Sequence, residues 1–155
     1  MYSRILVAMD DSESSRHALE HAVGLAKALP ASLRVIHVAD MGWLPIGPEV
    51  AFDTHALMAA RRDVGERIVT LARGILQAAA LEPDAALVET ETPTQHVAQA
   101  IAQEASRWNA DLVMLGTHGR RGYQHLVLGS VAEQMARLSS RPLLLIPLPR
   151  TSPPA

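Results

Sequence analysis

The chain has no cysteine, no marked excess of charge and no long apolar run, and each absence removes a class of protein. Without cysteine there is no disulfide framework, zinc ribbon or thiol chemistry, which is consistent with a reducing compartment. Fourteen basic and sixteen acidic residues give a formal net charge of −2 with no basic run longer than a pair, so we expect neither nucleic acid nor an anionic membrane as partner. No apolar run could span a bilayer, and acidic residues arrive within the first ten, so we expect no signal peptide and a cytoplasmic protein.

The sequence also lacks two features of efficient phosphoryl-transfer enzymes. No lysine follows its glycines in the manner of a Walker motif, and no pair of carboxylates is evident that could order two metal ions. Phosphoryl transfer requires a positioned base or water-orienting group and strong charge neutralisation. We therefore expect ligand binding rather than efficient turnover.

The pattern of apolar residues predicts one α/β domain over residues 1–149, followed by a disordered tail at 150–155. Short apolar runs typical of strands alternate with helical patterns. The predicted strands are 4–9, 33–39, 85–90, 112–115 and 142–147, and the predicted helices are 13–29, 53–80, one opening at Pro93 and Thr94, and one opening at Ser130. The expected buried helical positions are Ala18, Ala22, Leu25, Leu29, Leu57, Val64, Ile68, Leu71, Ile75, Val97, Ile101, Ala105, Trp108, Val131, Met135 and Leu138.

Strands that alternate with helices specify a parallel sheet covered on both faces, with right-handed crossovers. In a five-stranded sheet of this kind, ligands bind beyond the carboxyl ends of the strands, where the strand order reverses. Asp10 ends the first strand and Gly116 ends the fourth. A doubly wound sheet in the order 3-2-1-4-5 would bring both residues to one crevice, with the more polar third strand at an edge.

The stretch most informative about function is residues 111–131, DLVMLGTHGRRGYQHLVLGSV. A buried strand is followed by Gly116 and Gly119 and, after nine further residues, by Gly129 and Ser130, where the pattern becomes helical. Glycine lets the backbone take positive φ and turn successive N–H groups toward one point, which makes an anion-binding site. A helix start adds unpaired N–H groups and the positive end of the helix dipole. Together these features favour phosphate binding.

Simpler interpretations exist for the same residues. The two nearby glycines could form only a turn, and Ser130 with Glu133 matches the S-x-x-E pattern of a capping box. Asp10 could simply cap the first helix. We expect His37, inside a strand, to be an interior or boundary histidine rather than a catalytic base.

Two further pairs of residues allow a binding role. Arg120 and Arg121 could screen the charge of a triphosphate or could only be solvated, and we include Arg120 among the candidate nucleotide-binding residues. His17 and His21 stand four apart on a predicted helix, a spacing that zinc could use. Because no further ligand lies nearby in the sequence, an exposed polar helix face is favoured there and no metal site is predicted.

The glycine pattern resembles that of the universal stress proteins, in the branch that binds ATP. That branch is marked by glycine, two residues, glycine, nine residues, glycine and then serine or threonine, as in Gly116, Gly119, Gly129 and Ser130. The segments RILVAMDDSE, RVIHV and RPLLLIP are similar as well. The resemblance implies the doubly wound order 3-2-1-4-5, ATP held with Mg²⁺ or Mn²⁺, and a homodimer through the last strand. An exposed edge as apolar as Leu143–Ile146 also favours pairing with a second copy.

The resemblance also implies roles for single residues. Asp10 would meet the ribose or adenine, and Val38 the adenine. The residues that would hold the phosphates are Gly116, His118, Gly119, Gly129, Ser130 and Val131. The expected function is that of a nucleotide-dependent stress or signalling regulator, with at most slow ATP hydrolysis or self-phosphorylation. The alternatives are an enzyme of adenylate or phosphoryl transfer chemistry and a protein that binds another adenine nucleotide, such as AMP or cyclic AMP.

Overall fold

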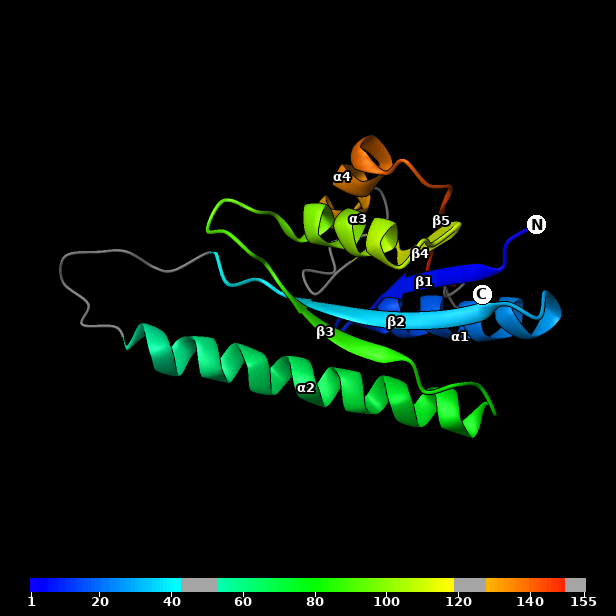
Figure 1. The fold of residues 1–155 in the computed structure, drawn as a ribbon, viewed down its shortest axis with the longest axis horizontal. Coiled ribbons are helices and arrows are strands. Elements are labelled where there is room, and N and C mark those ends of the chain that lie inside the picture. Colours follow the sequence, from blue (N-terminus) through cyan, green and yellow to red (C-terminus); the bar gives the residue numbers. More distant parts are fainter. Residues whose placement is uncertain (43–52, 119–127, 150–155) are drawn as a thin grey trace, which may run out of the picture.

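The computed structural model describes residues 1–42, 53–118 and 128–149, in which strands and helices alternate (Figure 1). The strands are β1 (Arg4–Ala8), β2 (Ser32–Ala39), β3 (Ala85–Glu89), β4 (Leu112–Gly116) and β5 (Leu143–Ile146). The helices are α1 (Glu13–Ala28), α2 (Thr54–Ala78), α3 (Val97–Arg107) and α4 (Ser130–Leu138). Within these ranges, no helix is both long and apolar enough to cross a membrane.

All five strands are parallel and lie in the order β3-β2-β1-β4-β5, which confirms the predicted fold. β1 is the central strand, and its Val7 is in register with Val35 of β2 on one side and Met114 of β4 on the other. The chain passes from β1 to β2 and β3 on one side, and later returns to β4 and β5 on the other side. The strand order therefore reverses between β1 and β4, which is where a doubly wound sheet binds its ligand.

Helices cover both faces of the sheet: α1 and α2 lie on one face, and α3 and α4 on the other (Figure 1). Successive residues of a strand point to opposite faces, so β1 contributes to two cores. Ile5 and Val7 pack in the core under α1 and α2, whereas Leu6 packs in the core under α3 and α4. The continuous apolar run of this strand is explained by burial on both faces.

Two of the residues predicted to be buried are exposed. Leu71 in α2 is 41% exposed, because the helix faces the sheet with a different stripe that includes Ile68, Ala72 and Leu76. Leu138 is 48% exposed because it ends α4. Small residues of the α2 stripe, such as Ala72, let the helix backbone lie close to the sheet. The spacing of apolar residues alone did not show which face of α2 would be buried.

The predicted start of the third helix is wrong by a few residues. Pro93 lies in a turn that is closed by a hydrogen bond from the N–H of Gln95 to the carbonyl of Thr92 (3.1 Å). The helix begins only at Val97, after His96, whose N–H donates to the side chain of Gln99 (2.9 Å). Proline suits the second position of a turn as well as the first turn of a helix, so its presence did not distinguish the two.

At the amino-terminal end of the strands, opposite the predicted site, Asp111 connects the start of β4 to the start of β1 by hydrogen bonds. Its carboxylate accepts hydrogen bonds from the N–H of Ser3 (2.8 Å), the hydroxyl of Ser3 (2.8 Å) and the N–H of Arg4 (3.0 Å). Burial raises the pKa of Asp111, but these hydrogen bonds to the charged form outweigh burial and the pKa lies below its ordinary value.

We expect Asp111 to make stability fall in acid. A carboxyl whose pKa is depressed in the folded state stabilises the fold fully above its unfolded pKa, near 3.9, and this contribution disappears as the pH falls through the lower folded value. Urea unfolding measured from pH 6 down to pH 3 should therefore show that the free energy of unfolding falls less in Asp111→Asn than in the wild type. The difference should be at most about 1 kcal/mol for each hydrogen bond that the carboxylate accepts. Asp63→Asn, at an exposed position of α2, is the control. Equal slopes for wild type and Asp111→Asn would contradict this assignment.

Candidate functional site

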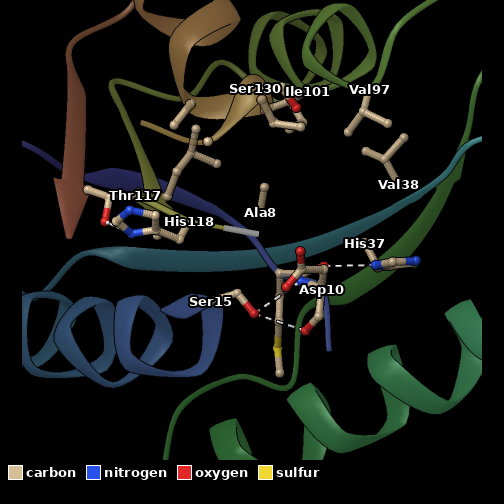
Figure 2. Close-up of a pocket in the computed structure, with 16 residues that line it drawn as sticks. Ala8, Asp10, Ser15, His37, Val38, Val97, Ile101, Thr117, His118 and Ser130 are labelled. Atoms are coloured by element: carbon tan, nitrogen blue, oxygen red, sulfur yellow. Dashed lines mark hydrogen bonds between the residues drawn. The ribbon is translucent and has the colours of Figure 1, made fainter. Parts of the chain in front are cut away.

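A cavity of about 120 Å³ lies beyond the carboxyl ends of β1 and β4, at the reversal of strand order (Figure 2). The ends of β1, β2 and β4 form one part of its wall, and α3 and α4 form another. The predicted site residues along it are Asp10, Val38, Gly116, His118, Gly129, Ser130 and Val131. Gly119 and Arg120 lie outside the described residues.

Asp10 begins the connection from β1 to α1, but it does not cap the helix. The cap is Ser12, whose hydroxyl accepts from the N–H of Ser15 (3.1 Å). One carboxylate oxygen of Asp10 accepts from the N–H of Ser12 (2.8 Å), which fixes the side chain in a local turn at the cavity wall. The simpler interpretation of Asp10 as a helix cap is therefore wrong.

The buried side chain of Ser15 braces the same connection (Figure 2). Its hydroxyl accepts from the N–H of Asp10 (3.2 Å) and lies close to the carbonyl oxygens of Asp10 (2.9 Å) and Ser12 (3.0 Å), to which it can donate. Three contacts to one hydroxyl hold Asp10 in one position relative to α1. Pre-positioning of this kind lowers the ordering cost of binding.

His37 is an interior histidine, as predicted, with 6% of its surface exposed. Its Nδ1 lies 2.8 Å from the carbonyl oxygen of Met9. A carbonyl oxygen only accepts, so Nδ1 carries the proton in this contact. His37 thus holds the backbone immediately before Asp10 and contributes to the shape of the cavity.

Gly116 is required for close packing rather than for backbone conformation. A Cβ atom at this position would lie 2.4 Å from the hydroxyl oxygen of Ser14 and 2.7 Å from its carbonyl carbon and oxygen. None of the glycines in the described parts of the chain has a positive φ. The expectation that Gly116 or Gly129 uses positive φ to turn N–H groups toward an anion is therefore wrong, whereas Gly116 lets the first turn of α1 approach the end of β4.

The start of α4 presents N–H groups to the cavity. Its N-cap is Gly129, with φ −60° and ψ 150°, and no side chain caps the helix. The first intrahelical hydrogen bond runs from Glu133 to the carbonyl of Gly129 (2.9 Å). The N–H groups of Ser130, Val131 and Ala132 therefore have no partner within the helix, and all three residues line the cavity.

The capping box expected at this helix start is not formed. Ser130 is the first helical residue rather than the cap, and the carboxylate of Glu133 instead pairs with Arg137 one turn later (2.7 Å). Because the cap residue is glycine, no cap side chain in the described part of the chain competes with a ligand for the first N–H groups of α4. Such a helix start favours an anion.

Thr117 and His118 directly follow β4 and are hydrogen-bonded to the residue before α4 and to α1, respectively. The carbonyl of Thr117 accepts from the N–H of Gly129 (2.7 Å), and the N–H of His118 donates to the hydroxyl of Ser14 (3.3 Å). The hydroxyl of Thr117 lies 2.9 Å from Nδ1 of His118. Nε2 of His118 is buried and has no hydrogen-bond partner among the described residues. A buried polar atom of this kind is costly until it finds a partner.

The backbone of Val38 faces the cavity as well. Alternate residues of a strand direct their N–H and C=O groups to opposite neighbouring strands. The carbonyl of Ile36 accepts from Met9 on the β1 side (2.8 Å). The carbonyl of Ala39 accepts from Thr90 on the β3 side (3.1 Å). The N–H and C=O of Val38 therefore point to the β1 side, beyond the point where β1 has ended, and offer a ligand a donor beside an acceptor.

A second hollow continues the cavity toward α2. It shares Asp10, His37, Val38, Val97 and Val131 with the first and adds residues of α2. The α2 residues in its wall are Ala60, Arg61 and Val64. The two spaces together extend from the start of α4, past Asp10, to the side of α2.

Two arginines of α2 hold the helix against the ends of β2 and β3. Arg61 donates to the carbonyl of Asp40, and Arg62 forms an ion pair with Glu89. The hydrogen bond from Arg62 is the main reason why the pKa of Glu89 lies below its ordinary value. These two contacts thus hold the part of α2 that lines the second hollow against the ends of β2 and β3.

Among the described lining residues of the first cavity, Asp10 is the only carboxylate, and none is lysine or arginine. Within this described part, attraction for an anion comes from the N–H groups and dipole of α4. The carboxylate of Asp10 is suited to accept hydrogen bonds from hydroxyl groups rather than to meet phosphate.

Sequence reasoning missed several cavity residues, namely Ala8, Ser15, Val97, Ile101, Leu115 and Thr117. A signal existed for Val97 and Ile101. A crossover helix in a parallel sheet starts near the carboxyl ends of the strands, so apolar residues in its first two turns lie near the ligand site. No comparable signal marked Ser15, whose role depends on the path of the backbone after β1.

Fold and cavity together define a doubly wound α/β protein with a cavity at its switch point. The profile of the universal stress protein family matches residues 1–147, and the chain belongs to this family. The universal stress protein YxiE of Bacillus subtilis is 29% identical over 149 residues, covering 94% of this chain and 99% of that protein.

Solved structures of the family have the same fold. A universal stress protein from Burkholderia pseudomallei is 33% identical, with a TM-score of 0.76 over 94% of this chain and 96% of that one. A universal stress protein from Archaeoglobus fulgidus, solved in complex with dAMP, is 20% identical, with a TM-score of 0.62 over 94% of this chain and 98% of that one. The recognition of the family from the sequence is confirmed.

Proposed function

We propose that this protein binds ATP in the cavity between β1 and β4 and acts as a nucleotide-dependent stress or signalling regulator in the cytoplasm. The observation that carries the proposal is the uncapped start of α4, whose N–H groups line the cavity at Ser130, Val131 and Ala132. Helix starts of this kind are ready-made phosphate sites. The dAMP complex of the family member from Archaeoglobus fulgidus supports an adenine nucleotide as the ligand.

In this proposal the phosphates lie at Gly129, Ser130 and Val131, with Gly116 and His118 on the other side. The ribose hydroxyls donate to the carboxylate of Asp10. The adenine lies against the backbone of Val38, whose N–H and C=O match a ring nitrogen and the exocyclic amine of the base. Gly119 and Arg120, which follow His118 in the sequence, remain proposed phosphate contacts.

The proposed metal is Mg²⁺ or Mn²⁺ bound mainly to the phosphates. Mg²⁺ keeps several waters and is commonly held by one or two carboxylates together with substrate phosphates. The only carboxylate among the described lining residues of the first cavity is Asp10. The metal would therefore add charge neutralisation that the protein side chains lack, and affinity for ATP should depend on its presence.

Binding without efficient turnover is part of the proposal. Asp10 is assigned to the ribose, and His37 is engaged by the carbonyl of Met9, so neither is assigned as a base at the terminal phosphate. Strong charge neutralisation by lysine or arginine is also absent from the described lining. We propose at most slow hydrolysis or self-phosphorylation, below the rate of about 1 per second that is typical of enzymes.

The second candidate ligand is a smaller adenine nucleotide such as AMP or cyclic AMP. The specific observation in its favour is that the Archaeoglobus fulgidus family member was solved in complex with dAMP, a nucleotide with a single phosphate. Calorimetric titration with ATP, AMP and cyclic AMP, each with and without Mg²⁺, tests the proposal. Tightest binding of ATP with Mg²⁺ supports it, tighter binding of AMP or cyclic AMP favours the second candidate, and no binding of any of them at about 1 mM excludes both.

We also propose that the protein forms a homodimer through β5. This strand is at the edge of the sheet, next to β4 only. The carbonyl oxygens of Pro142 and Ile146 accept hydrogen bonds from the β4 side (3.0 Å each), so by alternation the backbone groups of Leu143 and Leu145 point outward. Outward N–H and C=O groups on an apolar edge are suited to pairing with a second copy.

Leu144→Lys should weaken this dimer by a factor of about 100, because the side chain is 40% exposed on the edge strand and like charges would meet across the twofold axis. Sedimentation equilibrium at micromolar concentration measures the effect. Leu71→Lys is the matched control, because Leu71 is 41% exposed on α2, which packs at the other side of the sheet. A monomeric wild type, or equal dissociation in both variants, would refute the dimer.

A further inference from the structure

The outer face of α1 carries a second cluster of chemically active side chains, away from the nucleotide cavity. The sequence HALEH places His17, Glu20 and His21 within two turns of the helix. The pattern histidine, two residues, glutamate, histidine is one in which two histidines on a helix bind zinc. We propose that His17 and His21 form a two-histidine site for a divalent transition metal such as Zn²⁺, independent of the nucleotide site.

The two imidazole rings are already close enough to share a metal. Their centroids are 4.6 Å apart and their planes are inclined at 86°. Two imidazole nitrogens bound to zinc at 2.0–2.1 Å in tetrahedral geometry have ring centroids roughly 5 Å apart. Only small side-chain rotations therefore separate the observed pair from a chelating one, and the regular backbone of α1 keeps the two residues on one face.

Glu20 lies beside His17, within a small movement of the contact that metal-binding histidines usually receive. Its carboxylate oxygen is 3.6 Å from Nδ1 of His17, just beyond hydrogen-bond distance, and its side chain is 74% exposed. On metal binding, the proposed movement of this carboxylate onto Nδ1 would fix the ring and leave Nε2 to bind the metal. Glu20 is therefore proposed to position His17 and is not itself a proposed ligand.

The surroundings leave room for an ion and its water ligands. His17, Glu20 and His21 line an open groove between α1 and the edge of the sheet, with Met114, Leu144 and Ile146 along its other wall. Gly24, one turn after His21, has open space where a side chain would lie. The side chain of His17 is only 24% exposed, so its ring is held in place more firmly than a fully solvated one.

The proposed site has two protein ligands. No group of three or more histidine, aspartate or glutamate side chains in the described ranges is arranged to hold a metal ion. Water would complete the coordination, as it does at the open positions of catalytic zinc. Imidazole ligands select Zn²⁺, Ni²⁺ or Cu²⁺ over Mg²⁺, which prefers oxygen, so the Mg²⁺ that accompanies ATP would not compete.

Zinc titration of the full chain, without a polyhistidine tag and after treatment with a chelator, tests the site. We expect one Zn²⁺ per chain by calorimetry at pH 7.5 without nucleotide, and a loss of affinity of at least about tenfold in His21→Gln, because one of two ligands is removed.

His55→Gln is the matched control, because His55 is exposed on α2 and is not part of the groove. It should bind zinc as the wild type does. Unchanged affinity in His21→Gln, an equal loss in His55→Gln, or no saturable binding below about 1 mM would each overturn the proposal. Because no nucleotide is present, these outcomes are independent of whether the protein binds ATP.

Discussion

Ser130→Asp is expected to weaken ATP binding by at least about 100-fold while leaving the fold intact. Ser130 is the first residue of α4 and lines the cavity where the phosphates are proposed to lie. Two like charges 4 Å apart repel by about 4 kcal/mol at the effective dielectric constant of a protein surface, which corresponds to a factor of several hundred. The same carboxylate interacts favourably with the helix dipole, so stability should rise by about 0.3–1 kcal/mol.

The opposite signs of these two effects make the experiment decisive. A variant that lost binding through misfolding would lose stability too, whereas Ser130→Asp should lose binding and gain stability. Ser130→Asn, which adds similar bulk without charge, is the control and should retain most of the affinity. Calorimetric titration with ATP and Mg²⁺ and urea unfolding provide the two readouts. Wild-type affinity in Ser130→Asp would remove the start of α4 from the site.

Gly116→Ala should destabilise the fold by about 2–3 kcal/mol, the upper part of the usual range for overpacking. The new Cβ would meet the hydroxyl oxygen of Ser14 at 2.4 Å and its backbone carbonyl at 2.7 Å. The backbone cannot rotate away as a side-chain end can, so the first turn of α1 must move. This movement would also shift the residues that brace Asp10, and ATP affinity should fall with stability.

Gly74→Ala is the matched control for that substitution. Gly74 lies within α2, and a Cβ there would meet nothing within 4 Å. Alanine is favoured over glycine inside a helix by about 1 kcal/mol, so this variant should be more stable than the wild type. The midpoint of urea unfolding measures both variants. A stability for Gly116→Ala equal to or above that of the wild type would show that Gly116 is not a packing requirement.

The fold could be predicted because its signals are local and redundant. Each strand is an apolar run and each of the four crossovers carries a helical pattern. The strand order was implied by the resemblance to the universal stress proteins, and it would bring Asp10 and Gly116 to one crevice. The confirmed order β3-β2-β1-β4-β5 agrees with that placement. Strand boundaries were accurate to about one residue. For β1 and β4 the reason is that burial on both faces begins and ends with the apolar run.

The cavity was harder to predict because its details depend on contacts between distant segments. Gly116 was predicted as a site residue for its backbone freedom, whereas in the structure it lines the cavity and its lack of a Cβ allows the close contact with Ser14. The pattern of Ser130 and Glu133 matched a capping box, yet the path of the chain made Gly129 the cap. In both cases the residue type fits several local geometries, and only the position of a neighbouring helix or loop selects one.

The main-chain donor and acceptor at Val38 exist because β2 extends beyond β1. Ala8, the last residue of β1, is in register with Ile36, whereas β2 continues to Ala39. The proposed recognition of a base at Val38 would be encoded in a difference of strand length and not in a side chain. Substitutions at position 38 that keep the strand should be tolerated by the ligand, whereas inserting a single residue between Ala8 and Asp10 would let the central strand grow and close off those groups. The proposed ligand preference would thus change more readily through insertions and deletions between β1 and α1 than through replacement of Val38.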